Sequence, residues 1–239
     1  IPIIRGILAL AETLSLGMDA LNYSSQVANQ EEDTPPSKFS SVMMILVSLS
    51  IAVGIFFILP LLVSKPFEGI LGSDVISNVA EGIIRLLVFL VYVTAISLMP
   101  DIRRVYMYHG AEHMAVHAQE KGKPLTIEEI RKYPTAHPRC GTAFLLTIMV
   151  IAIVVFTFIP RDPLWMVIGS RIVLIPLIAS LSYEFIRFNS KYETNKWVSK
   201  LSIPNLLLQS LTTKIPDDDQ IEVAISAMKL AISTDAKSM

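Results

Sequence analysis

Four long apolar stretches constrain the fold of this chain more than any other feature of its sequence. A helix needs roughly 17–25 predominantly apolar residues to cross the hydrocarbon core of a bilayer. The sequence contains four stretches of this kind, at Ser41–Ser64, Val79–Leu98, Thr142–Ile159 and Trp165–Ile186. The mean hydropathy is +0.55 and only 17% of the residues are charged, whereas the charged fraction of soluble domains is about 25%. We therefore predict an all-α membrane protein, with four transmembrane helices in one membrane domain over residues 1–239 and the lipid bilayer as its partner.

The basic residues indicate how these helices are oriented. Lys and Arg gather in the segment 101–141 and again after Arg187, whereas the two opposite loops carry only Lys65 and Arg161. The positive-inside rule then places both termini and the segment 101–141 in the cytoplasm. The formal charge of -1 argues against nucleic acid as a partner, because binding to phosphates requires a basic excess.

Two arginines lie inside the predicted spans. Arg85 and Arg171 are each near the outer end of their span, and Glu81 lies one helical turn from Arg85. Long basic side chains near the end of a span can extend their charge to the interface. We interpret both arginines as anchors of this kind, with Arg85 able to pair with Glu81.

The polar segments carry helix signals of their own. Residues 6–27 have an apolar stripe typical of an amphipathic helix, and the proline-bearing segment 29–38 reads as a linker. In the cytoplasmic loop at 101–141, Asp101 is a candidate N-cap and Gly122 a candidate stop for one helix, and Thr126 to Glu129 matches a capping box for a second. The tail at 201–234 is predicted to form interfacial amphipathic helices that could dock other membrane proteins.

All four histidines and the only cysteine lie between His109 and Cys140. His109, His113 and His117 are spaced four residues apart, so a helix presents them on one face. The same helix has an apolar stripe into which His109, Glu112 and His113 fall, together with Ile102, Val105 and Val116. We therefore predict that these ionisable residues occupy the buried face.

The order His109-x-x-Glu112-His113 matches the inverted zinc-peptidase motif, in which the histidines bind the ion and the glutamate activates water. A catalytic zinc site needs three protein ligands and an open position. His109 and His113 would be two of the ligands, and Glu112 the general base. For the third ligand the sequence leaves four candidates, which are His137, His117, Cys140 and Glu184 at the cytoplasmic end of the fourth span.

Structural explanations exist for the same residues. A histidine such as His117 can serve as a hydrogen-bonded core residue, Cys140 can be a small packing residue, and Arg139 can bind lipid headgroups. A channel or transporter is disfavoured, because the first and third spans carry no ionisable residue.

Four blocks of the sequence, in order along nearly the whole chain, resemble the YqhQ family of bacterial membrane proteins. They are Tyr108-His-Gly-Ala-Glu-His113, His137-Pro-Arg-Cys-Gly-Thr142, Ser182-Tyr-Glu184 and the segment from Leu211 to Ile225. The resemblance implies a multi-pass protein of the bacterial cytoplasmic membrane, in a family commonly described as predicted metal-dependent enzymes. It also implies that the family pattern includes His109, Glu112, His113, His137, Arg139, Cys140 and Glu184, and it names no substrate.

Two functions from different classes follow. The first is a metal-dependent enzyme, expected to be a hydrolase that uses zinc or a similar divalent transition metal at the cytoplasmic membrane boundary. The second is a non-catalytic scaffold or assembly factor for membrane proteins, in which the cluster of histidine, glutamate and cysteine is structural.

Overall fold

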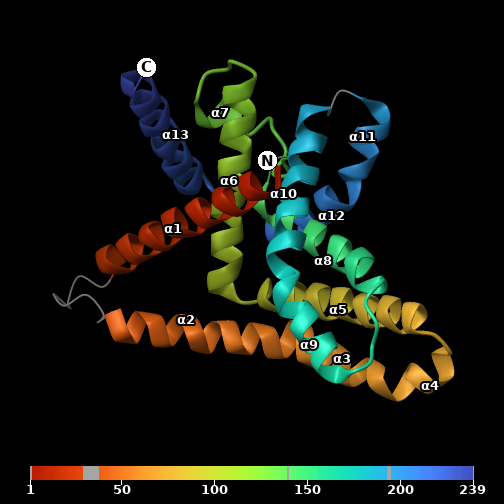
Figure 1. Ribbon diagram of the computed structural model, residues 1–239. Coiled ribbons are helices and arrows are strands. Elements are labelled where there is room, and N and C mark those ends of the chain that lie inside the picture. Colours follow the sequence, from red (N-terminus) through yellow and green to blue (C-terminus); the bar gives the residue numbers. More distant parts are fainter. Residues whose placement is uncertain (1, 29–37, 139, 193–194, 239) are drawn as a thin grey trace. The chain divides into compact units, whose positions relative to one another are not determined.

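The computed structural model describes residues 2–28, 38–138, 140–192 and 195–238, and every regular element in these ranges is helical (Figure 1). The prediction of an all-α chain is thus confirmed. Arg139 and the predicted linker at 29–38, except Lys38, lie outside the described residues. In chain order the elements are α1 (Pro2–Ala28), α2 (Lys38–Val53), the π-helix η1 (Gly54–Ile58), α3 (Leu59–Ser64), the 3-10 turn η2 (Lys65–Phe67), α4 (Glu68–Leu71), α5 (Asp74–Ile96), α6 (Pro100–Glu120), α7 (Ile127–Ile130), α8 (Gly141–Thr157), α9 (Leu164–Val173), α10 (Ile175–Lys191), α11 (Lys196–Leu201), α12 (Ile203–Thr212) and α13 (Asp218–Ser238).

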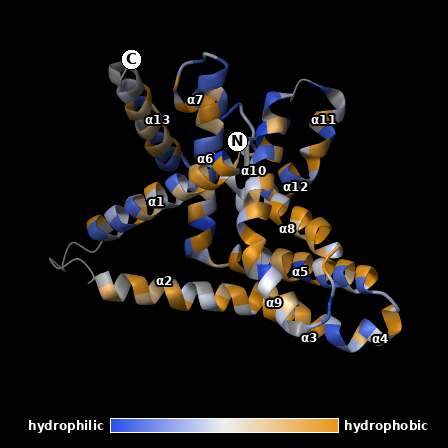
Figure 2. Cartoon of the chain, viewed as in Figure 1, coloured by the Kyte–Doolittle hydropathy of each residue, from blue (hydrophilic) through white to orange (hydrophobic). Residues whose placement is uncertain are grey.

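Two helical runs are long and apolar enough to cross a membrane, at Val42–Leu71 and at Asp74–Ile96. A third span is obtained if Trp165–Arg171 and Ile175–Asn189, which meet at a bend of 40°, count as one broken helix. The apolar part of α8, Phe144–Thr157, is shorter than the other runs. Figure 2 shows apolar residues along most of α2 and α8, whereas α1 and α6 alternate between polar and apolar positions. The apolar helices indicate membrane association with two to three spans, and the fourth span stays a prediction.

The chain divides into two compact units, one of residues 1–89 and 148–185 and the other of residues 90–147 and 186–239. In the first unit, a small apolar core forms around Ala152, Phe156 and Ile178. Gly82 of α5 lies against Ile153 so closely that an added Cβ would meet its side chain at 2.5 Å. A glycine is therefore needed for α5 and α8 to pack at this distance.

The first unit also buries a group of charged side chains. The carboxylate of Glu81, only 1% exposed, accepts hydrogen bonds from Arg85 at 2.5 Å, Arg161 at 2.9 Å and Arg171 at 3.1 Å. Arg85 Nε donates to the carbonyl of Phe56 at 2.9 Å, within the π-helix η1. The predicted pairing of Arg85 with Glu81 is confirmed. The interpretation of Arg85 and Arg171 as outward anchors is wrong. Arg85 is 2% and Arg171 9% exposed, and both guanidinium groups turn towards Glu81.

The second unit is built around α6, which packs against α7 and α13 through a shared apolar core. α6 begins with Pro100 at its first helical position and Met99 as the N-cap, so Asp101 lies in the first turn and not at the cap as predicted. The fixed φ of proline suits that first position. The predicted stop at Gly122 is confirmed by its φ of 63°, a conformation that glycine adopts without strain.

The ends of the shorter helices follow their capping residues. Thr126 accepts a hydrogen bond from the Glu129 amide at the start of α7, as the capping box predicts. Asp217 and Gln220 cap α13 reciprocally, each side chain accepting from the other residue's backbone N–H at 2.9 Å. The acidic block before α13 therefore has a local structural role, since it satisfies donors that a helix start leaves unpaired.

Candidate metal centre

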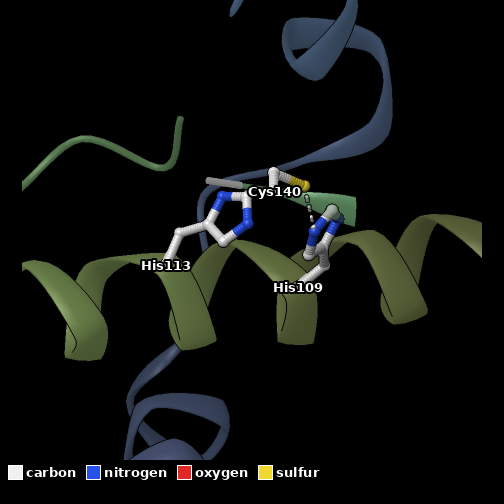
Figure 3. A group of neighbouring side chains, drawn as sticks. All are labelled: His109, His113 and Cys140. Carbon is white, nitrogen blue, oxygen red and sulfur yellow. Dashed lines mark hydrogen bonds between the residues drawn. The ribbon is translucent and has the colours of Figure 1, made fainter. Parts of the chain in front are cut away.

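His109 and His113 lie one turn apart on α6 and face Cys140, which immediately precedes α8 (Figure 3). The two imidazole rings meet edge to face, with centroids 4.3 Å apart. His109 Nε2 lies 3.2 Å from Cys140 Sγ. One ligand atom from each of the three residues falls within 4.8 Å of the others. The helical spacing thus brings two nitrogen donors together, and the loop before α8 places a sulfur donor beside them.

The other nitrogen of each ring is held by a backbone carbonyl. His109 Nδ1 lies 2.9 Å from the Thr212 carbonyl oxygen, and His113 Nδ1 lies 2.6 Å from that of Thr135. A carbonyl oxygen only accepts hydrogen bonds, so Nδ1 must carry the proton in both rings. In the neutral rings the lone pair is therefore on Nε2. Metal-binding histidines in proteins are commonly oriented by an N–H donated to a carbonyl in this way.

The surroundings of Cys140 favour its thiolate. Burial by itself raises the pKa of this thiol, but its side-chain contacts with His109, His113 and Thr142 outweigh burial and lower the pKa to about 5. Thr142 contributes through both its backbone N–H at 3.3 Å and its hydroxyl at 3.0 Å from Sγ. Burial lowers the pKa of His109, yet its contacts with Cys140 and the Thr212 carbonyl raise it overall. Because the thiolate is the form that binds metals, Cys140 is prepared to act as a ligand at neutral pH.

His117, Glu120 and His137 form a second group whose ligand atoms also lie within 4.8 Å of one another. His137 Nε2 lies 3.2 Å from a carboxylate oxygen of Glu120, and His117 Nε2 lies 2.9 Å from the Ala136 carbonyl. Burial lowers the pKa of His137, and Glu120 opposes that shift. Its ring lies 4.5 Å from that of His117 between centroids. All four histidines of the chain therefore gather along α6.

Gln209 of α12 fixes the loop that carries His137. This fully buried side chain accepts from the His137 backbone N–H at 2.7 Å and donates to its carbonyl at 2.9 Å. Both hydrogen-bonding functions of the amide are used on one residue. The loop between α7 and α8 is thereby held against α12 at the point where it enters the histidine group.

A family model described as a protein of unknown function (DUF1385) matches residues 1–234. The chain belongs to this family. It is 31% identical over 252 residues to the "Uncharacterized protein YqhQ" of Bacillus subtilis (strain 168), an alignment that covers 100% of this chain and 79% of that protein. No solved structure matches the chain. The resemblance to the YqhQ family is thus confirmed, and neither description names an activity or a ligand.

The structure brings some of the predicted site residues together and places others elsewhere. His109, His113 and Cys140 come together, which favours Cys140 among the candidates for the third ligand. Glu112 is exposed, so its predicted place on the buried face is wrong, as is that of Val105. The helix instead buries the face that carries Gly110, Ala111, His113, Met114, Ala115 and Ala118.

Two other predicted residues have different surroundings. His137 belongs to the second group, and Glu184 belongs to the other unit, where it accepts hydrogen bonds from Arg5 at 2.6 and 2.7 Å. Sequence reasoning missed Glu120 and the carbonyls of Thr135 and Thr212. Glu120 lies three residues after His117 on the same helix, a spacing that could have suggested it. A backbone carbonyl leaves no signal in a sequence.

The donor set suits a transition metal. Thiolate and imidazole are the ligands that structural and catalytic zinc sites use, and thiolate selects against the hard ions magnesium and calcium. Two nitrogens with oriented lone pairs and one low-pKa sulfur, all from the described residues, supply three donors that could hold such an ion.

Proposed function

We propose that this protein is a membrane-embedded, metal-dependent enzyme, a hydrolase whose ion is held by His109, His113 and Cys140. The observation that carries the proposal is the orientation of the two imidazoles, whose Nδ1 atoms contact the carbonyls of Thr212 and Thr135. This arrangement leaves both Nε2 lone pairs available beside Cys140.

A bound divalent transition metal would supply Lewis acidity and would lower the pKa of a water molecule to about 7. The protein's own residues would hold that ion and orient its surroundings. Three protein ligands leave one tetrahedral position for water or substrate. Glu112 is the proposed general base, because its exposed carboxylate lies next to His113 in the chain and its charge contributes to the raised pKa of His109.

The substrate class of this proposal is a membrane-associated peptide or lipid. α6 follows the span-length helix α5 after only a short turn at 97–99, so its histidines are close in sequence to a membrane-spanning element. With the basic residues of segment 101–141, the positive-inside rule supports a cytoplasmic position for α6. A reacting bond at the membrane boundary could therefore be reached from the bilayer.

The experiment is metal analysis of the purified full chain, followed by replacement of the metal with Co²⁺. We expect about one transition-metal ion bound at the first group, and a thiolate-to-cobalt charge-transfer absorption that Cys140→Ser abolishes. His113→Gln should lower metal affinity, whereas the matched variant His117→Gln should leave the thiolate absorption in place. A protein that binds no transition metal even after supplementation would refute the proposal, as would an unchanged spectrum in Cys140→Ser.

The same spectra separate the two histidine groups. If an additional ion binds at His117, Glu120 and His137, then His137→Gln should reduce the stoichiometry without affecting the thiolate absorption. If His137→Gln removes that absorption, His137 belongs to the same shell as Cys140, and the ligand set proposed above is incorrect.

A non-catalytic scaffold is the second candidate function. It is supported by the way the cluster ties α6 to two other segments, the loop between α7 and α8 through Thr135 and Cys140 and the end of α12 through Thr212. It is also supported by the exposed apolar side chains Val223 and Leu230 on α13.

Complementation of a strain that lacks the gene distinguishes the two functions. If Glu112→Gln restores growth or the relevant phenotype while Leu230→Asp does not, the scaffold function is favoured. The opposite result favours catalysis. Leu230 is 68% exposed, so its substitution tests docking without disturbing the core of the second unit.

A further inference from the structure

The first unit buries more positive than negative charge. Three guanidinium groups, those of Arg85, Arg161 and Arg171, share the carboxylate of Glu81. Arg161 also pairs with the partly exposed Glu68. After that pair is set aside, Arg85 and Arg171 divide one negative charge between them. A buried excess of one positive charge is costly unless an anion compensates it.

Arg171 carries part of this excess charge. Its side chain is nine-tenths buried, and its Nη2 atom donates to both oxygens of Glu81. Its Nη1 atom is fully buried and has no hydrogen-bond acceptor among the residues that the structure describes. The guanidinium also lies 3.9 Å from the ring centroid of Phe156. Burial of an unpaired charged donor costs several times more than that of a paired one, so this nitrogen indicates a ligand.

Arg171 lines a cavity of about 410 Å³ in the same unit. Most of the cavity wall is apolar, with contributions from Phe57, Leu61, Leu62 and Ile168. Its charged lining consists of Arg171, Arg161, Lys65, Glu68, Glu81 and Asp162. Lys65, which is exposed and forms no ion pair with a described residue, also lines it. Cavities of roughly 300–1,000 Å³ with an apolar wall and a few polar groups are typical of small-molecule sites.

We propose that this cavity binds an anionic phospholipid, whose phosphate oxygen accepts the N–H of Arg171 Nη1 and whose hydrocarbon chain lies along the apolar wall. A bare phosphate would satisfy Arg171 and leave the apolar wall without a partner. A neutral lipid would fill the apolar wall and leave the buried charge uncompensated. An anionic amphiphile meets both requirements, and bacterial and other membranes supply acidic phospholipids in quantity.

Lys65 supplies a second positive charge to the same ligand. Lys65 is exposed and Arg171 is buried, and both side chains line the cavity. The site is independent of the proposed metal centre, since all of its residues belong to the first unit. Loss of lipid binding and loss of metal binding are therefore separate observations.

The experiment is native mass spectrometry of the full chain, purified in detergent and mixed with equal amounts of phosphatidylglycerol and phosphatidylcholine. We expect phosphatidylglycerol to be retained preferentially. Arg171→Gln should weaken its retention by about tenfold or more, because one charge-assisted hydrogen bond is removed. Arg131→Gln, which changes an exposed arginine of the other unit, is the matched control and should behave as the unchanged protein.

A second pair of variants tests the cavity without touching the charges. Leu62→Trp places an indole on the cavity wall and should abolish retention of phosphatidylglycerol. Leu59→Trp, one turn away at a residue that does not line the cavity, should retain it. If Arg171→Gln does not fold, as judged by circular dichroism, this pair decides the question.

Three results would overturn the proposal. The first is equal retention of the two lipids, and the second is unchanged retention in both Arg171→Gln and Leu62→Trp. The third is complete release of the lipid by millimolar inorganic phosphate, which would identify the site as one for free phosphate.

Discussion

Gly110→Ala is expected to destabilise the protein, because the space beside Gly110 has no room for a Cβ. Gly110 follows His109 on α6, and a Cβ added to it would lie 2.2 Å from the backbone carbonyl oxygen of Lys214. It would also lie 3.2 Å from Cγ2 of Thr135. The obstruction at Lys214 is backbone, so no side-chain rotation can relieve it. The segment after α12 must therefore move away from α6.

The size of that movement sets the expected effect. Real Cβ atoms essentially never approach another heavy atom more closely than 3.0 Å. The Lys214 carbonyl oxygen, at 2.2 Å from the added Cβ, must therefore move by about 0.8 Å. The Lys214 N–H bonds the Tyr106 carbonyl at 2.9 Å, and His109 Nδ1 bonds the Thr212 carbonyl at 2.9 Å. A shift of this size along either bond lengthens it beyond 3.5 Å.

We estimate the free-energy cost from three terms. Overpacking costs about 1–3 kcal/mol, and the loss of two hydrogen bonds adds about 1–3 kcal/mol. The better helix propensity of alanine offsets about 1 kcal/mol. The net loss of unfolding free energy is about 1–5 kcal/mol. If His109 also loses its orienting carbonyl, metal affinity should fall by about 10–100-fold.

Thermal unfolding in detergent measures the stability change, and competition with a metal chelator measures the change in affinity. Gly17→Ala on α1 is the matched control, because nothing lies within 4 Å of an added Cβ there and only the gain in helix propensity of up to about 1 kcal/mol is expected. Equal stability of the two alanine variants would contradict the close approach of Lys214 to α6. Reduced stability with unchanged metal affinity would support that approach and count against His109 as a ligand.

Three further predictions concern buried polar groups. Glu81→Gln leaves three buried guanidinium groups around a neutral amide and should destabilise the protein by about 3–5 kcal/mol, whereas Glu12→Gln at an exposed position of α1 should have no measurable effect in the same unfolding assay. Gln209→Leu removes both hydrogen bonds to the His137 backbone and should cost about 2–4 kcal/mol; hydrogen exchange at the His137 amide should accelerate, and unchanged exchange would contradict the contact. In metal-free protein Cys140 has a pKa of about 5 against 9.0 for an unperturbed thiol, so its stabilisation is complete above pH 9, declines as pH falls and is lost below about pH 5; thiolate absorbance across this range checks it, and a folded-state midpoint near 9 would contradict it.

Hydropathy and capping signals predicted much of the fold. The apolar runs at Ser41–Ser64 and Val79–Leu98 predicted two long helices, which the structure has at Val42–Leu71 and Asp74–Ile96. Such runs are readable in a sequence because a helix satisfies its own backbone hydrogen bonds in the bilayer. The end of α6 was predicted from Gly122, which adopts a positive φ, and the start of α7 from Thr126, whose side chain accepts a hydrogen bond from the Glu129 N–H. The number of spans was predicted less well. Four were expected, whereas the structure has two or three among its described residues, since α8 is short and the helix after it is bent.

The candidate site was predictable where it depended on helical spacing. His109 and His113 come together because residues four apart on a helix are neighbours. Cys140 approaches them only through the fold of the loop between α7 and α8, which the sequence does not encode at any fixed spacing. Glu112 was misplaced because its periodicity fits two overlapping stripes, and the small residues Gly110 and Ala111 decide which face α13 and Lys214 can approach.

The architecture of the second unit connects metal binding to its folding. The proposed ligands come from α6 and from the residue before α8, while the carbonyls that orient them come from Thr135 in a loop and from Thr212 at the end of α12. None of these contacts exists in an unfolded chain, so the free energy of binding an ion at this site includes that of bringing the segments together. An ion that binds the folded chain selectively must then raise its thermal stability in proportion to the logarithm of the metal concentration above the dissociation constant. A metal-dependent rise in the unfolding temperature that Cys140→Ser abolishes is therefore expected even if the reaction that the site supports is not a hydrolysis.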